Sequence, residues 1–139
     1  MPTQVNEKRI LIADALHPIF KERAIKMGYE VDDMPHISRE ETLAIIEGYH
    51  GIAVRTKFSI DEEILEKGSQ LQFVARAGAG LDNIDVDFAK LRGIQLLNAP
   101  EGNSDAVGEH AMAMLLSLLN NLYKGYQEVR NGIWDREGN

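Results

Sequence analysis

The sequence predicts a single α/β domain built on a parallel β-sheet, and three observations support this. Short runs of apolar and β-branched residues alternate with amphipathic stretches of helix length, five times in succession. The run at residues 9–13 (RILIA) is apolar after its first residue, which is typical of a strand buried on both faces. At 139 residues the chain is long enough for one compact unit with a sizeable core.

The end points of these elements follow from caps and glycines. Pro18 begins a helix that Gly28 ends, and Ser38 with Glu41 three positions later forms a capping box. The expected strands are residues 9–13, 29–32, 51–55, 71–75 and 94–97. The expected helices are residues 18–27, 38–48, 60–67 (begun by Ser59 or Asp61) and 86–91 (capped by Asp85). Five βα units in a row favour right-handed crossovers, so we expect a three-layer, flavodoxin-like fold with strand order 2-1-3-4-5.

The stretch at residues 104–130 is expected to form one long helix that differs from the others. Gly125 is a candidate position for a break or bend. Its middle, AMAMLLSLLNNL, is apolar on two opposite sides: Ala111, Leu115, Leu118 and Leu122 form one, and Met112, Leu116, Leu119 and Tyr123 form the other. One sheet cannot cover both sides. Two interpretations follow: a buried core helix, or a helix that packs on another domain or another copy of the chain.

Composition excludes several classes of function. The chain has no cysteine, so it has no disulfide framework, thiolate metal site or cysteine nucleophile. Its net charge of -7, without a basic stripe, argues against nucleic acid and anionic membranes as partners. The N-terminal stretch has no apolar signal segment and no run is long enough to span a membrane, so we expect a cytoplasmic protein.

Ligands of open parallel sheets bind outside the carboxyl ends of the strands. The third, fourth and fifth expected strands deliver polar or glycine-rich segments there, at residues 55–57, 78–80 and 98–104. In the expected strand order these segments lie side by side. Together they form the candidate binding site.

The segment RAGAGLDNID (residues 76–85) resembles the start of a dinucleotide-binding loop but lacks two of its requirements. Asn83 stands where a third glycine is needed, and no acidic residue ends a strand about 20 residues later. Two glycines around a small residue instead offer unobstructed backbone N–H groups, which suit a small anion such as a carboxylate. Ordinary turn chemistry is the alternative.

Two arginines lie near these segments. Arg55 directly follows an apolar run, so its guanidinium is expected at the rim of the crevice, where it suits a carboxylate or phosphate. The alternative is a surface arginine paired with a helix carboxylate. Arg76 could reach the site or form a structural ion pair, and we favour the structural ion pair.

The histidines and Asp14 point to no further chemistry. None of the four histidines has metal-ligand spacing with another, so no metal site is expected. His110 is expected to be packed or hydrogen-bonded, and His17 to shape the first loop. Asp14 after the first strand suggests a phosphoacceptor receiver domain, but Arg55 and Asn98 stand where that class needs an Asp and a Lys.

Three segments together resemble the N-terminal part of the D-2-hydroxyacid dehydrogenases, most closely the phosphoglycerate dehydrogenase branch of that family. They are VRTKFSIDEEIL, the run from LQFVARAGAGLDNID through NAPEGNSDAVGEHAMAMLLSLL, and RNGIWD. The resemblance covers roughly residues 9–136. Its combination of R-x-G-x-G-x-D-N-I-D with N-A-P and N-S-x-x-V-x-E-H at these spacings is far more specific than any one piece.

The resemblance implies a substrate-binding lobe at residues 1–103 and a crossover helix and tail at 104–139 that lead into an NAD-binding Rossmann lobe. It implies that a 2-hydroxy or 2-keto acid contacts Arg55, Thr56, Lys57, Gly78, Ala79, Gly80 and Asn103. It also implies that Ala79, Ser104 and Val107 lie near the nicotinamide of the NAD cofactor.

In the family, the Rossmann lobe and the catalytic Arg, carboxylate and His lie further along the chain than Asn139. The resemblance therefore implies a chain that is inactive alone and binds NAD weakly. Its partners would be the small acid and other copies of itself, with possible exchange of the helix at residues 104–130. The alternative function is a non-catalytic module for small-anion binding or assembly derived from the same lobe.

Overall fold

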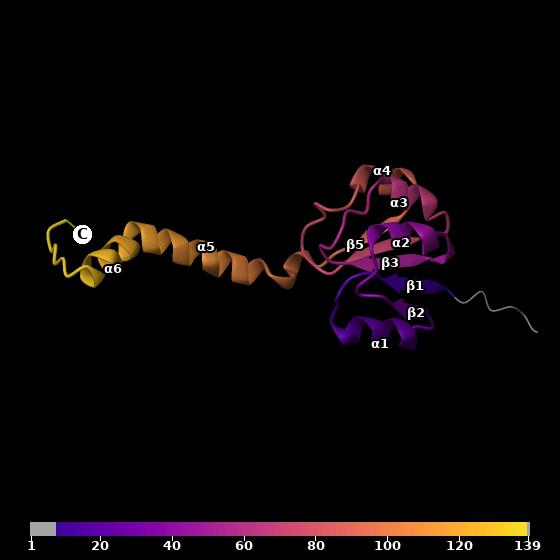
Figure 1. Cartoon of the computed structure of the whole chain (residues 1–139), viewed down its shortest axis with the longest axis horizontal. Coiled ribbons are helices and arrows are strands. Elements are labelled where there is room, and N and C mark those ends of the chain that lie inside the picture. Colours follow the sequence, from indigo (N-terminus) through magenta and orange to yellow (C-terminus); the bar gives the residue numbers. More distant parts are fainter. Residues whose placement is uncertain (1–7, 139) are drawn as a thin grey trace, which may run out of the picture. The chain divides into compact units, whose positions relative to one another are not determined.

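The computed structural model describes residues 8–138, which divide into two compact units after Pro100 (Figure 1). The first unit contains a five-stranded sheet with the order β2-β1-β3-β4-β5, and all of its strand pairs are parallel. This confirms the predicted topology. The strands are β1 (Arg9–Ile12), β2 (Glu30–Asp33), β3 (Gly51–Val54), β4 (Phe73–Arg76) and β5 (Gln95–Leu97).

The helices of the first unit begin at side-chain caps, three of which the sequence indicated. Ser38 and Glu41 form the expected capping box, Asp61 rather than Ser59 caps the third helix, and Asp85 caps the fourth. The helices are α1 (Pro18–Lys26), α2 (Arg39–Ile45), α3 (Glu62–Lys67) and α4 (Val86–Leu91), with short 3-10 turns η1 (Ile46–Gly48) and η2 (Pro100–Gly102) near the ends of α2 and β5. The predicted helix at residues 38–48 is thus an α-helix that tightens in its last turn.

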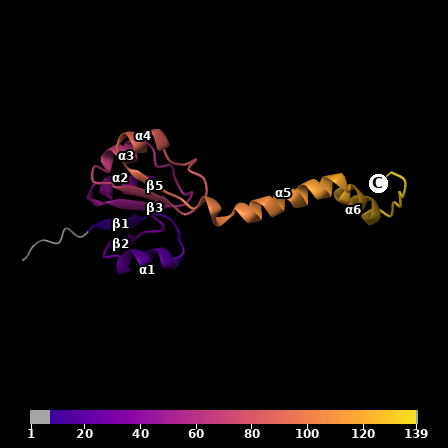
Figure 2. The ribbon, with the colours of Figure 1, turned by 180° about the vertical axis from the view of Figure 1, so that it is seen from behind.

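The helices cover the two faces of the sheet unequally. Figures 1 and 2 show α1 on one face and α2, α3 and α4 on the other. The larger core lies under these three helices and is built around Leu11, Ile52 and Val74, all fully buried. The smaller core, around Ile12, Ala53 and Ala75, lies under α1. Because one helix covers less area than three, the α1 face keeps an apolar groove of about 480 Å³.

A polar cluster ties β1 to β2 and to Tyr49, which directly follows η1. The Arg9 guanidinium lies 2.5 Å from Asp32 and 4.7 Å from the centre of the Tyr49 ring, and the Tyr49 hydroxyl donates to Asp32 at 2.7 Å. Burial and the hydrogen bond to Asp32 raise the pKa of Tyr49 to about 12. The phenol is therefore held in its neutral, donating form.

The second unit contains two helices where one was predicted. They are α5 (Ser104–Leu119) and α6 (Leu122–Arg130), separated by Asn120 and by Asn121, which has a left-handed backbone (φ 50°). The expected break at Gly125 is therefore wrong, because Gly125 lies inside α6. Asparagine tolerates the left-handed conformation better than other non-glycine residues, which explains why the chain turns at Asn121.

Both sides of α5 expose apolar side chains, including Met112, Leu116, Leu118 and Leu119. The two helices of this unit bury none of their own residues to the degree seen in the sheet. In the part of the chain described, neither they nor any other helix is long and apolar enough to cross a membrane.

Candidate functional site

The loops that follow β3 and β4 lie side by side at the carboxyl edge of the sheet. The Ala77 N–H donates to Val54 O at 2.8 Å, and Ile60 and Ile84 form a parallel bridge further along. The Ile60 N–H donates to Asn83 O and the Asp85 N–H donates to Ile60 O, at 2.8 and 2.9 Å. The structure thus brings residues 55–57 and 78–80 together, as the strand order requires.

The glycine turn at residues 78–80 has its carbonyl groups bonded and two of its N–H groups free. Gly78 O accepts from the Ala99 N–H at 3.0 Å, Ala79 O from the Asn98 side chain at 2.6 Å, and Gly80 O from the Arg76 guanidinium at 2.8 Å. Within residues 8–138, the N–H groups of Ala79 and Gly80 donate no hydrogen bond. The turn therefore presents two adjacent donors that are available to an anion.

Space rather than backbone angle favours glycine at Gly78, because the Arg76 side chain is held in place, whereas at Gly80 the exposed Asp82 side chain can move aside. Neither Gly78 nor Gly80 has a positive φ. A Cβ at Gly78 would lie 2.7 Å from Nη1 of Arg76, and one at Gly80 would lie 2.7 Å from Oδ1 of Asp82. Glycine at position 78 therefore has two explanations. It leaves room for the Arg76 side chain, and it leaves the backbone N–H groups of the turn open to an anion.

Arg76 is a structural brace, mainly through hydrogen bonds to backbone carbonyl groups rather than through the ion pair favoured from the sequence. Its side chain is only 10% exposed, and its guanidinium donates from Nε to Arg55 O at 3.2 Å and from Nη1 to Gly80 O at 2.8 Å. The ion pair with Asp82 is longer, at 3.5 Å, and Asp82 is 80% exposed, so it contributes little. Arg76 holds the loop after β3 to the glycine turn.

Two asparagines complete these connections, and their roles were not predicted from the sequence. Asn83 donates from Nδ2 to Arg55 O and Phe58 O, both at 3.2 Å. It stands where a nucleotide-binding loop would have its third glycine and instead joins the two loops. Asn98 fixes the Ala79 carbonyl. The sequence carried a weak signal for both, since an asparagine at a strand end often bonds to a nearby backbone.

The backbone of residues 55–57 closes around a carboxylate of the protein itself. Oδ2 of Asp14 accepts from the N–H groups of Arg55, Thr56 and Lys57 at 3.0, 2.9 and 3.1 Å, and Oδ1 accepts from the Ala15 N–H at 2.7 Å. We call these three N–H groups of residues 55–57 the N–H nest. Partial burial raises the pKa of Asp14, but the backbone donors outweigh this effect and hold the pKa below its ordinary value.

The side chains of residues 55–57 differ in how free they are. The Arg55 side chain is exposed, and among residues 8–138 no hydrogen bond or ion pair is made by its guanidinium. The alternative of a surface ion pair with a helix carboxylate is therefore not observed. Lys57 donates from Nζ to Pro35 O at 2.8 Å, which directs its charge toward the loop after β2. Thr56 is exposed.

The histidines have separate roles. His17 is the N-cap of α1, because its Nδ1 accepts from the Ile19 N–H at 3.2 Å, so the expectation that it shapes the first loop is confirmed. His110 is exposed on α5, so the expectation that it is packed or hydrogen-bonded is wrong. In the described part of the chain, no three His, Asp or Glu side chains gather as metal ligands do.

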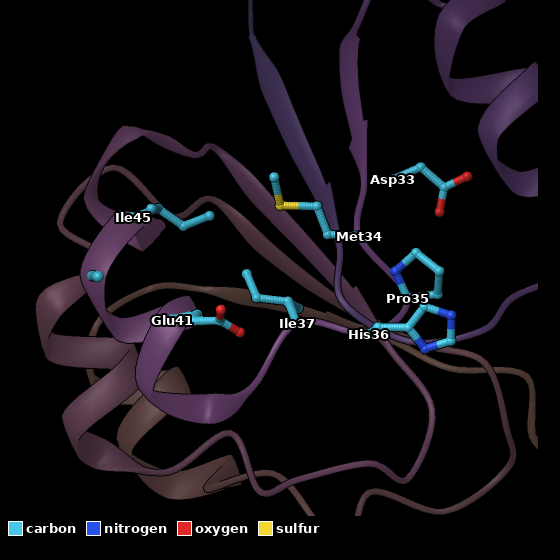
Figure 3. A pocket seen from close by; sticks show the side chains of 8 residues that line it. Asp33, Met34, Pro35, His36, Ile37, Glu41 and Ile45 are labelled. Carbon is cyan, nitrogen blue, oxygen red and sulfur yellow. The ribbon is translucent and has the colours of Figure 1, made fainter.

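A hollow lies beside the loop after β2, away from the glycine turn. It encloses about 660 Å³, is shallow and mainly apolar, and is lined by Asp33, Met34, Pro35, His36, Ile37, Glu41, Ala44 and Ile45. Figure 3 shows Met34, Ile37 and Ile45 facing one another across it, while the Asp33 carboxylate points away. Because no set of polar groups converges on it, we assign it no chemistry. A smaller hollow of about 230 Å³ borders the glycine turn, with Arg76 and Asn98 in its lining.

The remaining predicted residues belong to the second unit. Asn103 is the N-cap residue of α5, without a side-chain capping bond, and Ser104 begins the helix. Asn103 and Val107 line a shallow groove along α5 together with His110 and Met114. Their roles as contacts of a substrate or cofactor remain predictions.

The described residues do not fit a dinucleotide. Their one glycine-rich turn after a strand has Asn83 in place of the third glycine, and the side chain of Asn83 is engaged with Arg55 O and Phe58 O. Its free N–H groups suit a small anion and leave no helix start against which a pyrophosphate would bind, since α4 begins only at Val86. Residues 8–138 therefore do not form the nucleotide-binding half of a dehydrogenase.

Comparison with known proteins identifies the class to which this chain belongs. The family described as "D-isomer specific 2-hydroxyacid dehydrogenase, catalytic domain" matches residues 10–131. The chain belongs to this family. Members of the family are NAD-dependent oxidoreductases.

Within the family, curated relatives of the chain are D-3-phosphoglycerate dehydrogenases. The protein of Archaeoglobus fulgidus is 33% identical over 93% of this chain and 24% of its own length, and the human protein is 30% identical over 95% and 25%. The chain therefore spans about a quarter of the length of the curated relatives it matches.

Solved structures show the same fold. The PH0520 protein of Pyrococcus horikoshii has a TM-score of 0.83 and 25% identity, over 94% of this chain and 39% of its own. An NAD+-bound 3-phosphoglycerate dehydrogenase of Entamoeba histolytica has a TM-score of 0.65 and 28% identity, over 80% of this chain and 39% of its own.

Proposed function

We propose that this chain is the substrate-binding part of an NAD-dependent D-2-hydroxyacid dehydrogenase of the D-3-phosphoglycerate dehydrogenase type. The observation that carries the proposal is the pair of free N–H groups at Ala79 and Gly80, on a turn that Arg76 joins to the backbone of Arg55. Within residues 8–138 the Arg55 guanidinium has no partner, and we propose that it faces the same ligand. A carboxylate accepts two such hydrogen bonds and is drawn by the positive charge, and each charge-assisted bond contributes about 1.5–3 kcal/mol.

In this proposal the site holds the carboxylate of a 2-hydroxy or 2-keto acid and so fixes the position of its C2 atom. Binding at a defined angle converts a bimolecular hydride exchange into a step within one complex. The chain's residues bind and orient the acid. The rest of the enzyme would hold NAD, which accepts the hydride, and supply the group that takes the hydroxyl proton.

The second unit would contribute Asn103 to the substrate and Ser104 and Val107, with Ala79, to the neighbourhood of the nicotinamide. Because residues 8–138 do not fit a dinucleotide, we expect the chain alone to bind NAD weakly and to be inactive. The apolar sides of α5 would pack on the remainder of the enzyme or on a second copy.

Substitution of Arg55 tests the carboxylate site. In the full-length enzyme, Arg55→Ala should lower kcat/KM for the hydroxy acid about 10- to 100-fold, since one charge-assisted bond is lost. The dissociation constant for NAD should stay within about twofold of the wild type, because the guanidinium would not contact NAD. Arg92→Ala, which removes an exposed arginine after α4, is the matched control and should change neither quantity. If Arg55→Ala weakened use of the acid and binding of NAD equally, or changed neither, Arg55 would not be part of the carboxylate site.

The alternative is a non-catalytic module that binds a small anion, and the same two N–H groups and Arg55 would serve it. The encoding reading frame separates the two functions. Continuation beyond Asn139 into a glycine-rich strand–loop–helix favours the enzyme, whereas a stop codon without such a sequence favours the module.

A further inference from the structure

The geometry at the carboxyl edge of the sheet points to a role for Asp14 that the sequence did not indicate. Asp14 follows β1, which lies between β2 and β3, and its side chain extends to the loop after β3. There Oδ2 accepts three consecutive backbone N–H groups within 3.1 Å. Three donors from one short segment converge on one oxygen only if the segment is curved around it, as in the anion-binding nests of other proteins.

The backbone of Arg55 is held at both of its polar groups. Asp14 accepts a hydrogen bond from its N–H group, and Arg76 and Asn83 donate to its carbonyl group. Both backbone polar groups of Arg55 are thus bonded, and its guanidinium alone is free. Such a residue loses little backbone freedom when it binds a ligand, which is how preorganisation raises affinity.

We propose that Asp14 is a positioning residue: its carboxylate occupies the N–H nest and thereby fixes Arg55 for the carboxylate of the substrate. The inference that Arg55 is positioned for a substrate rests on the proposed function, but the contacts of Asp14 with the nest do not depend on it. It follows that the nest accepts a carboxylate, and that a small external carboxylate should replace the side chain when it is removed.

The first test follows the backbone of the nest directly. In Asp14→Gly, hydrogen exchange of the amides of residues 55–57 should be about 10- to 100-fold faster than in the wild type, because hydrogen bonds to a charged acceptor are lost. Sodium formate should slow the exchange again in a saturable manner and shift the three amide signals together in ¹⁵N spectra, whereas sodium chloride should not. Asp87→Asn, an exposed carboxylate in the first turn of α4, is the matched control and should leave the three amides unchanged.

Asp14→Asn provides the same test with smaller risk to folding, because the amide side chain keeps the shape and one acceptor oxygen. It should show faster exchange at residues 55–57 but no formate response, since the nest is still filled. Exchange within about twofold of the wild type in both variants would overturn the proposal. So would an Asp14→Gly chain in which formate restores nothing.

A double-mutant cycle tests positioning rather than general stability. Asp14→Asn should weaken binding of a 2-hydroxy acid, and the double variant Asp14→Asn/Arg55→Ala should bind no more weakly than Arg55→Ala alone, because Asp14 acts through Arg55. Additive losses would contradict the role. A different outcome is that the acid does not bind the wild type at Ala79 and Gly80 although formate slows amide exchange in Asp14→Gly. That outcome would refute the proposed function but not the finding that the Asp14 carboxylate fills the N–H nest.

Discussion

Removal of the Arg76 guanidinium should destabilise the first unit by about 2–4 kcal/mol. The guanidinium donates to Arg55 O and Gly80 O from a side chain that is 10% exposed, and hydrogen bonds to charged groups contribute about 1.5–3 kcal/mol each. Two such bonds give about 3–6 kcal/mol. Both carbonyl groups belong to exposed residues, so in the variant water would bond to them and recover part of the ~3–6 kcal/mol. The expected loss of stability is therefore about 2–4 kcal/mol.

Arg76→Met keeps the apolar stem and removes only the donors, so it isolates this effect. Urea unfolding should be followed by far-UV circular dichroism and by the amide signals of β3 and β4, because the single tryptophan, Trp134, is 83% exposed and lies in the second unit. Arg92→Met is the control and should change the free energy of unfolding by less than about 0.5 kcal/mol. If Arg76→Met were as stable as this control, the guanidinium would not hold the two loops together.

Three further outcomes follow from the structure. Gly78→Ala should cost about 1–2 kcal/mol, because the new methyl group would displace the Arg76 guanidinium, and the cost should disappear in an Arg76→Met background. Tyr49, with a folded pKa of about 12 against about 10 unfolded, should contribute stability below pH 10 that is lost as the pH rises to 12, and its phenolate absorbance should appear last. The chain should self-associate through α5, and Leu118→Lys should shift sedimentation toward the monomer.

Each of these has a contradicting result, and the glycine substitution also has a matched control. Gly108→Ala, where a Cβ would meet nothing within 4 Å, should not destabilise the chain, and an equal cost at both glycines would remove the steric argument. Tyr49→Phe should delete the last phase of the absorbance titration, and an unchanged last phase in this variant would contradict the assignment. A monomeric wild type at high concentration would contradict self-association.

The topology was predictable because each βα unit carries its own signals. Asp85 and the capping box at Ser38 fixed the starts of α4 and α2, and the buried run of β1 fixed a central strand. The break at Asn121 was not predictable from helical periodicity, which continues across it. An asparagine can end a helix in a left-handed conformation or remain inside one, and the sequence does not show which occurs.

The candidate site was predictable in its backbone and less so in its side chains. The strand order brought Arg55 and the glycine turn to one edge, since the carboxyl ends of parallel strands share it. The contact of Asp14 with residues 55–57 spans more than 40 positions and depends on how two loops curve, which leaves no local pattern. The contacts of Asn83 with Arg55 O and Phe58 O likewise leave no local pattern. In the sequence, Asn83 was informative only because it replaces the third glycine of a nucleotide-binding loop.

A titration of the ¹⁵N-labelled chain with D-glycerate, compared with glycerol, tests the central claim most directly. Glycerol lacks the carboxylate but keeps the hydroxyl groups. We predict saturable shifts of the Ala79 and Gly80 amide signals with D-glycerate only, abolished by Arg55→Ala and unchanged by Arg92→Ala. Shifts that are equal for both compounds, or that spare Ala79 and Gly80, would show that the glycine turn does not bind the carboxylate.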